Sequence, residues 1–416
     1  MKLLEYLYLA LRGLSINKLR SALTVLGIVI GVGAVISLMS VGRGAGAEIT
    51  SRIQSMGTNL LFVRPGAVSE RGVRQAIGTR TTLTLEDAEA LADPLKCPSV
   101  ALVAPEGSAF VQVVAGSENV NTRVLAVTPE YEPVRNFTVA EGEFITEQNL
   151  KARSMVCVLG SEVAETLFDG NDPLGQVVKI ARRPFRVIGV LEEKGGTSFF
   201  SPDETVVIPL TTAMYRLMPR RTARGGHNVG VINVQATSEE EIDAAEEQIR
   251  AVLRQRHHLI DGEDDDFTIT SQKDILGTLK GATNVLTILL GSIAGISLLV
   301  GGIGIMNIML VTVTERTREI GIRKAVGAKR RDILLQFLIE SATLSFSGGL
   351  LGILLGWGLS HLISSLKIGG QVIHTTITPD IVLLAVSVTV VIGLFFGIYP
   401  ALRAARLNPI DALRYE

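Results

Sequence analysis

The chain has 416 residues, of which 47% are hydrophobic and only 19% are charged. Water-soluble proteins usually carry more charge, so the composition excludes an ordinary soluble globular protein. The charge is also uneven, because residues 44–280 sum to −9 whereas the rest of the chain sums to +8. The basic residues flank apolar runs and form no stripe on a soluble face, so we expect no nucleic-acid partner.

Residues 1–20 predict an amphipathic helix at the cytoplasmic surface of a membrane. Its leucines recur on one face, at Leu3, Leu7, Leu11 and Leu14, and its charged residues lie elsewhere. A helix of this kind lies in the membrane interface. A plain basic leader is the alternative.

Four uncharged runs each predict a helix that crosses the membrane. The first run has 22 residues between Arg20 and Arg43, which is long enough to span a bilayer at about 1.5 Å per residue. It is also longer than the apolar part of a signal peptide, which favours an uncleaved anchor. The expected spans are 21–43, 281–314, 333–366 and 381–402.

The first two spans are expected to project beyond the membrane as a stalk. The apolar stripe of the first span continues through Ile49, Ile53 and Met56. The second uncharged run has 34 residues, more than a bilayer needs.

Lysine and arginine residues near the span ends predict the orientation of the chain. They gather before the first span, in the loop 315–332 and in the tail 403–416, whereas the loop 367–380 has only Lys367. All three basic segments are cytoplasmic if both termini are cytoplasmic. Residues 44–280 are then extracytoplasmic.

Small-xxx-small patterns in all four spans predict close helix packing or a dimer seam. Ordinary glycine enrichment in membrane helices is the alternative. Apart from Glu340, which is expected to pack or to snorkel near the cytoplasmic interface, the spans offer no chain of buried ionisable groups for an ion path. The glycines expected at helix contacts are Gly27, Gly31, Gly291, Gly295, Gly348 and Gly352.

Residues 44–280 predict a mixed α/β domain. One helix is expected at 85–92 with Thr84 as its N-cap, and another at 238–255 with Ser238 and Glu241 as a capping box. Glycine-rich stretches predict mobile loops at 64–80, 195–198 and 225–226. The expected strands are 59–63, 100–103, 110–114, 155–159, 177–180, 185–190, 206–209 and 230–235.

The domain shows no catalytic or metal-binding pattern. The acidic run 261–266 lacks the ligand spacing of an EF-hand and is interpreted as a solvated turn. His257 and His258 end a helix, where they interact favourably with its dipole, and they lack zinc-site spacing. Cys97 and Cys157 both lie where a disulfide is permitted, but the sequence leaves their pairing open.

Residues 315–332 predict a short charged helix at the membrane surface, ended by Gly327. Its apolar edge, formed by Ile320, Ile322 and Val326, favours docking onto a cytoplasmic partner, and a purely topogenic basic loop is the alternative. The residues expected to form the docking site are Glu315, Arg316, Arg318, Glu319, Ile320, Gly321, Ile322, Arg323, Lys324, Ala325 and Gly327.

This segment resembles the signature of the MacB/FtsX family of ABC transporter permeases, also called type VII or mechanotransmission transporters. The resemblance extends to residues 18–31, 57–60, 265–268 and 399–414, so it covers nearly the whole chain in the right order. It implies a four-helix membrane protein of the bacterial cytoplasmic (inner) membrane. It also implies a large extracytoplasmic α/β domain with a porter-like part and a sabre-like insertion at about 116–226.

The resemblance further implies the partners of the chain. These are a cytoplasmic ABC ATPase docked on residues 315–328, a second permease subunit (a homodimer is expected), an extracytoplasmic membrane-fusion adaptor and membrane lipid. The sequence has no G-x-x-x-x-G-K-[ST] phosphate loop, so ATP and Mg are expected on a separate ATPase chain and no cofactor on this one.

The expected function is that of a non-catalytic permease subunit in the export of amphipathic small molecules or peptides. A lipoprotein-releasing permease and a non-transport mechanotransmitter that regulates a cell-wall hydrolase remain alternatives. A membrane-anchored external enzyme is a further alternative, which hydrolytic activity of residues 44–280 would support.

Overall fold

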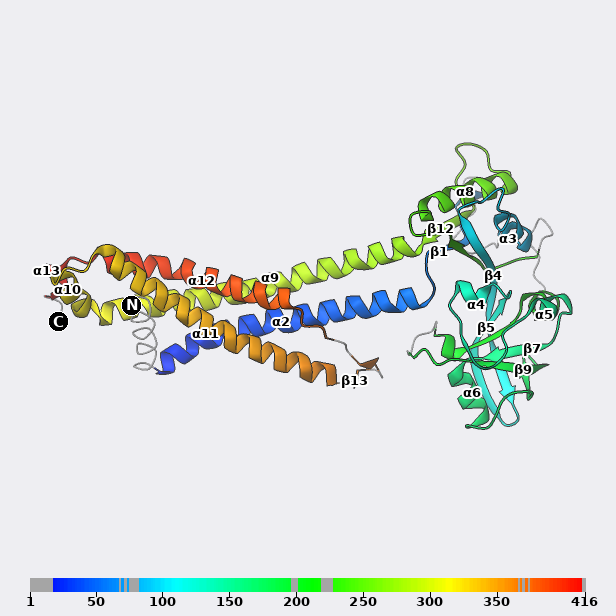
Figure 1. Cartoon of the computed structure of the whole chain (residues 1–416), viewed down its shortest axis with the longest axis horizontal. Coiled ribbons are helices and arrows are strands. Elements are labelled where there is room, and N and C mark those ends of the chain that lie inside the picture. The colour runs from blue at the N-terminus through cyan, green and yellow to red at the C-terminus, as the bar shows by residue number, and fades with distance from the viewer. Residues whose placement is uncertain are drawn as a thin grey trace. The chain divides into compact units, whose positions relative to one another are not determined.

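The computed structural model describes residues 18–66, 69–70, 73–74, 82–195, 201–217, 227–365, 367–368, 371–372 and 375–413. The chain folds as two compact units, a helical unit of residues 1–48 and 279–416 and an α/β unit of residues 49–278 (Figure 1). The amphipathic helix expected at residues 1–20 and the glycine-rich loops lie wholly or largely outside the described residues.

The helical unit contains four helices that are long and apolar enough to cross a membrane. They are α2 (Lys18–Ser55), α9 (Gln272–Glu315), α11 (Arg330–Ser365) and α12 (Pro379–Arg406). The expectation of four membrane helices with a large α/β insertion between the first and the second is confirmed.

Two of these helices run well past their uncharged stretches. Helix α2 continues to Ser55, and α9 begins at Gln272, so α9 has 44 residues and is about 66 Å long. That length is roughly twice the hydrocarbon thickness of a bilayer. The division between the two units therefore falls inside both helices, at 48/49 and 278/279, and not at the ends of the apolar runs.

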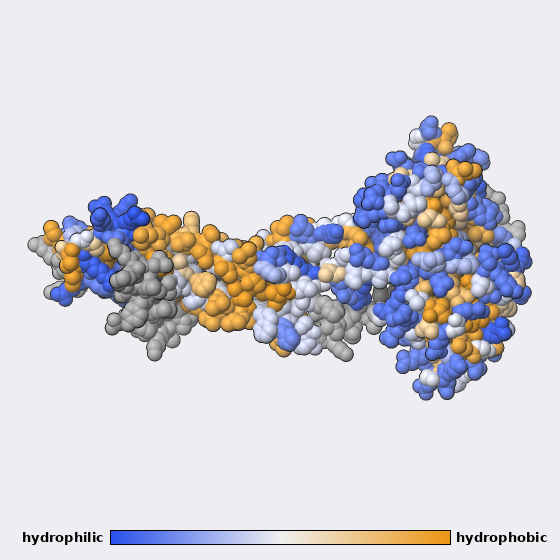
Figure 2. All heavy atoms as spheres, viewed as in Figure 1, coloured by the Kyte–Doolittle hydropathy of each residue, from blue (hydrophilic) through white to orange (hydrophobic). Residues whose placement is uncertain are grey.

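Apolar side chains cover the outside of the helical unit as well as its interior. Figure 2 shows apolar surface over the middle of these helices and a mixture of hydrophilic and apolar surface at the end that carries α10 and α13. Val285, Leu383 and Phe395 are each more than 60% exposed on α9 and α12. An apolar surface of this extent is suited to lipid and not to water.

Short elements connect the long helices. At one end of the unit, α10 (Thr317–Ala325) packs against α13 (Pro409–Leu413). Gly327 has φ of 110°, a left-handed conformation that ends α10 and admits glycine without strain. The strand pair β13 (Lys367–Ile368) and β14 (Gln371–Val372) lies between α11 and α12.

The α/β unit is built on a ten-stranded mixed sheet in the order β12-β1-β11-β4-β5-β10-β7-β9-β6, with β8 paired to β4 and β9. Most pairs are antiparallel, while β10 runs parallel to β5 and β7 runs parallel to β9. The strands are β1 (Leu60–Pro65), β4 (Val100–Ala115), β5 (Glu118–Val127), β6 (Val139–Gly142), β7 (Val156–Leu159), β8 (Val177–Ile180), β9 (Arg183–Leu191), β10 (Thr205–Pro209), β11 (Val231–Ala236) and β12 (Phe267–Ser271). A separate hairpin pairs β2 (Ser69–Glu70) with β3 (Val73–Arg74).

Helices cover both ends of this sheet. In Figure 1, α3 (Leu85–Leu91) and α8 (Ile242–His257) lie with β12 and β1, and α6 (Ser161–Phe168) lies at the other end with β9. The remaining helical segments are α4 (Tyr131–Val134), α5 (Glu147–Lys151), α7 (Leu210–Thr212), a 3-10 turn (Pro202–Glu204) and a π turn (Ala213–Leu217). Two apolar clusters form the core, one around Leu61 and Phe185 and one around Tyr131 and Phe144.

The α/β unit differs from the sequence-based expectation in several details. The two strands expected at 100–103 and 110–114 are one continuous strand, β4, because its hairpin with β5 pairs every residue from Glu106 to Ala115. Strands β5, β6 and β12 were not expected. The capping box expected at Ser238 is wrong, since α8 begins at Ile242 and the carboxylate of Glu241 accepts a hydrogen bond from Ser99 Oγ instead.

The sabre-like insertion expected at about 116–226 begins in the turn of the β4–β5 hairpin and ends outside the described residues. Its limits stay a prediction. Cys97 and Cys157 are both buried and free, so no disulfide joins them in the structure.

Candidate functional site

The candidate docking helix, α10, is fixed to the helical unit by its charged residues. Arg316 lies 3.4 Å from the carboxylate of Glu340, which is only 7% exposed on α11. Arg323 donates a hydrogen bond of 2.5 Å to Gln336 of α11 and also pairs with Glu319 one turn back. Glu340 therefore has the packing role expected for it, as the ion-pair partner of α10.

Lys324 joins α10 to the end of another span. Its Nζ donates hydrogen bonds to the main-chain oxygens of Ala405, at 2.6 Å, and Leu407, at 2.7 Å. The last carbonyls of a helix have no partner within the helix, so a cation there satisfies them and interacts favourably with the helix dipole. Burial lowers the pKa of Lys324, and the nearby charge of Arg330 lowers it further.

These contacts divide the eleven expected docking residues into two faces. The inward face is held by Arg316, Ile320, Gly321, Arg323 and Lys324, and Ile320 is only 3% exposed. The outward face carries Glu315, Arg318, Glu319, Ile322, Ala325 and Gly327.

The apolar edge expected to dock is thus smaller than the sequence indicated. Ile320 belongs to the core of the helical unit, because it packs with the buried residues of the four spans. Ile322 is 50% exposed and Val326 is 86% exposed. Val326 lies directly after α10, and together with the six exposed residues named above it forms what we call the outward face of α10.

Four of the six expected packing glycines lie at helix contacts. Gly27 faces the backbone of Gly301, so α2 and α9 approach closely there. Gly348 and Gly352 of α11 face Ile28 and Val32 of α2, and a Cβ on Gly352 would lie 2.6 Å from that of Val32. Gly31 faces the side chain of Leu298.

The other two glycines, Gly291 and Gly295 of α9, face no atom of the described chain within 4 Å. Two further glycines also lie at helix contacts, of which Gly302 was not expected and Gly393 belongs to the small-xxx-small pattern of the fourth span. A Cβ on Gly302 would meet the ring of Phe396, and Gly393 faces Ser345 across α11 and α12. The spacing predicted close packing at Gly393, but it could not identify Ser345 as the partner.

Comparisons with known proteins agree with both units. Residues 21–252 match the MacB-like periplasmic core domain, and residues 291–409 match the FtsX-like permease C-terminal domain. The chain is 41% identical over 416 residues to the macrolide export ATP-binding/permease protein MacB of Bdellovibrio bacteriovorus, covering 100% of this chain and 62% of that protein. It is 42% identical over 415 residues to the protein of the same name from Azoarcus sp., covering 100% of this chain and 60% of that protein.

The chain spans about three-fifths of the length of these relatives. Among solved structures, the periplasmic region of MacB from Actinobacillus actinomycetemcomitans is similar, with a TM-score of 0.45 and 24% identity over 56% of this chain and 98% of that chain.

Proposed function

This chain belongs to the family of MacB-like and FtsX-like ABC transporter permeases, and from that membership we propose that it couples ATP hydrolysis to movement of its periplasmic domain. In this proposal a cytoplasmic ATP-binding chain docks on α10, and the four spans carry its movement to the α/β unit. Movement of the α/β unit then drives the export of amphipathic small molecules or peptides.

The outward face of α10 is the observation that carries this proposal. Ile322 and Val326 are 50% and 86% exposed on the charged segment between the second and third spans. Behind them, Arg316, Arg323 and Lys324 bind α11 and the end of α12. A force applied to the outward face is therefore transferred to the spans.

The remaining parts of the proposal follow from family membership and from charge. Both termini lie in the cytoplasm, since the basic segments then lie on one side. In this proposal ATP and Mg bind to the ATP-binding partner and not to residues 1–416, which contain no phosphate-loop pattern. A second copy of the chain packs against Gly291 and Gly295, and a membrane-fusion adaptor binds the periplasmic domain.

The test is co-purification of the ATP-binding partner with the full-length permease from membranes. Ile322→Asp and Val326→Asp place a charge on the outward face without touching the contacts behind it, so we expect at least a tenfold loss of bound ATPase, or about 1.4 kcal/mol. Leu95→Asp, at a residue that is 94% exposed in the α/β unit, is the control and should bind normally. Unchanged ATPase binding by both variants would contradict docking at α10.

A further inference from the structure

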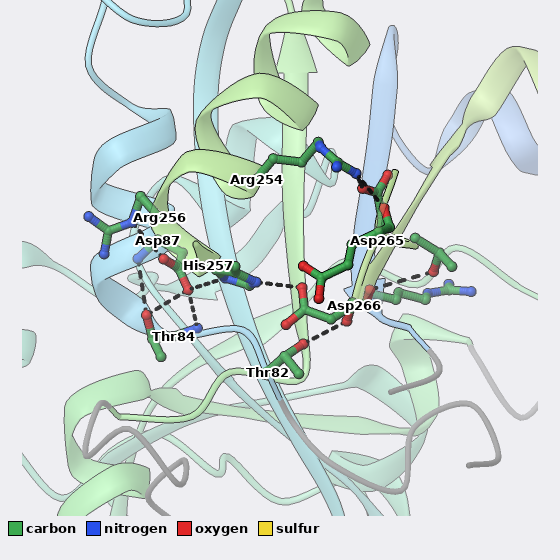
Figure 3. Close-up of polar contacts among 11 residues, drawn as sticks. Thr82, Thr84, Asp87, Arg254, Arg256, His257, Asp265 and Asp266 are labelled. Carbon is green, nitrogen blue, oxygen red and sulfur yellow. Dashed lines mark hydrogen bonds and ion pairs between the residues drawn. The ribbon is translucent and has the colours of Figure 1, made fainter. Parts of the chain in front are cut away.

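A buried charged cluster lies where α3, α8 and the start of β12 meet (Figure 3). His257, the last residue of α8, is 3% exposed. Its Nδ1 lies 2.6 Å from Asp266 Oδ1, and its Nε2 lies 3.3 Å from Asp87 Oδ2 of α3. One imidazole thus connects carboxylates from two other elements.

Further groups hold Asp87 by its carboxylate and Asp266 by its main-chain carbonyl. Asp87 also accepts hydrogen bonds from Arg256 Nε, at 2.6 Å, and from Thr84 Oγ1, at 2.7 Å. The carbonyl oxygen of Asp266 accepts from the N–H of Gly66 and from Thr82 Oγ1, both at 2.9 Å.

The charges of the cluster determine its protonation. Burial by itself lowers the pKa of His257, but the hydrogen bonds and charges of Asp266 and Asp87 outweigh burial and raise the pKa to about 9. Burial raises the pKa of Asp87, but hydrogen bonds from His257, Arg256 and Thr84 hold it well below its usual range. Arg254 and Arg250 behind the cluster pair with Asp265. At neutral pH His257 is therefore an imidazolium, and it lies between the carboxyl groups of Asp87 and Asp266.

The position of this cluster in the chain matters, because β12 continues without a break into α9. At the other end of β12, the side-chain Nε2 of Gln272 donates to the carbonyls of Ile53, at 2.7 Å, and Gly57, at 2.9 Å. Gln272 thus fastens the start of α9 to the end of α2. The cluster at Asp266 fastens the opposite end of the same strand to α3 and α8.

We propose that Asp87, His257 and Asp266 form a clasp that fixes α3 and α8 to β12, so that movement of α9 is passed to these two helices. The proposal rests on the mechanical role proposed above. Apolar packing between α8 and the sheet is non-directional and tolerates sliding, whereas short charged hydrogen bonds fix both distance and direction. His257 is a positioning residue in this scheme.

The clasp predicts a specific pH dependence of stability. Because the folded-state pKa of His257 is raised from 6.5 to about 9, its contribution is fully present below about pH 6.5 and is lost as the pH rises through about 9. The lowered pKa of Asp87 acts at the acid end, where its contribution is lost as the pH falls below the unfolded value of about 4. Both contributions are fully present between about pH 4 and about pH 6.5. The full-length wild-type chain should therefore have its highest melting temperature in this pH range.

The variants are chosen to break the clasp while the fold is kept. His257→Asn removes the bridging cation, and we expect the apparent melting temperature to fall by roughly 10 °C. The variant should also no longer lose stability as the pH rises through about 9. Asp266→Asn is the milder variant, because it keeps the volume and the main-chain carbonyl. His258→Asn is the matched control, since this neighbour is exposed and has a left-handed φ of 55°, which asparagine tolerates.

Spin labels at Glu89→Cys on α3 and Thr268→Cys on β12, both exposed positions, measure the clasp directly in the full chain in nanodiscs. Cys97 and Cys157 are buried and should stay unlabelled. We expect a narrow distance distribution for wild type and His258→Asn, and a distribution at least twice as wide for His257→Asn and Asp266→Asn. The distance distribution of the wild type should widen in the same way above about pH 9.

A distribution that stays as narrow in both clasp variants as in wild type overturns the proposal. No nucleotide or partner chain enters this measurement, so that outcome leaves docking at α10 untouched. With the ATP-binding partner and ATP added, the distance should stay constant in wild type and change in His257→Asn. An equal change in both would show that the clasp passes no movement to α3.

Discussion

At the scale of single residues, Lys324 lends itself to a test of how α10 is attached. Lys324→Met removes the two hydrogen bonds to the last carbonyls of α12. The group is only partly buried, so we expect a loss of about 1 kcal/mol, seen as a melting temperature lower by a few degrees for the full chain in detergent. Arg318→Met, on the exposed side of the same helix, should melt as wild type does. An equal fall in both variants would mean that lost charge, and not the contact with α12, is responsible.

Residue roles could be predicted from sequence only where the partner is close in the chain. Thr84 was expected as an N-cap, and it forms a capping box with Asp87 three residues away. The equivalent expectation at Ser238 failed because Glu241 binds Ser99, which lies 142 residues away. The contacts of Lys324 with the end of α12 and of His257 with Asp87 were not predicted for the same reason, because these partners are distant in the sequence.

At the scale of elements, the contact of α2 with α11 depends on glycines. A Cβ on Gly352 would lie 2.6 Å from Val32 Cβ, so Gly352→Ala must push the two helices apart. We expect a net loss of about 1–3 kcal/mol, since overpacking outweighs the better helix propensity of alanine. The control is Gly358→Ala on the same helix, which meets nothing within 4 Å and should be neutral or stabilising. The melting temperatures of the two variants are compared. If Gly352→Ala and Gly358→Ala melt at the same temperature, there is no tight contact at Gly352.

A helix or strand could be predicted where the hydropathy and charge of its own residues are sufficient to identify it. Hydropathy and charge over about 20 residues located all four membrane helices, because lipid requires a continuous apolar helix. Strand β5 was missed because its first half is polar and exposed and only its end is buried. The order of the strands was not predictable, since pairs such as β1 with β12 join residues about 200 positions apart.

At the scale of the whole molecule, α9 has two adjacent glycine positions that no described residue covers. Gly291 and Gly295 face no atom of the described chain within 4 Å, whereas Gly27, Gly352 and Gly393 on the other three spans face a neighbouring helix. A glycine face on a membrane helix allows another helix to approach closely. The proposed second copy of the chain would fill this position.

Gly291→Leu combined with Gly295→Leu tests this arrangement. The two side chains would project from α9 without a clash inside the chain, so the melting temperature of the monomer should not fall. They would prevent close approach of a second helix, so we expect the fraction of dimer to fall at least tenfold when subunits are counted in nanodiscs at limiting protein. Gly358→Leu, on an equally open position of α11, is the control and should leave the dimer intact. If the α9 double variant dimerises as wild type does, the second copy binds elsewhere and α9 faces lipid along this side.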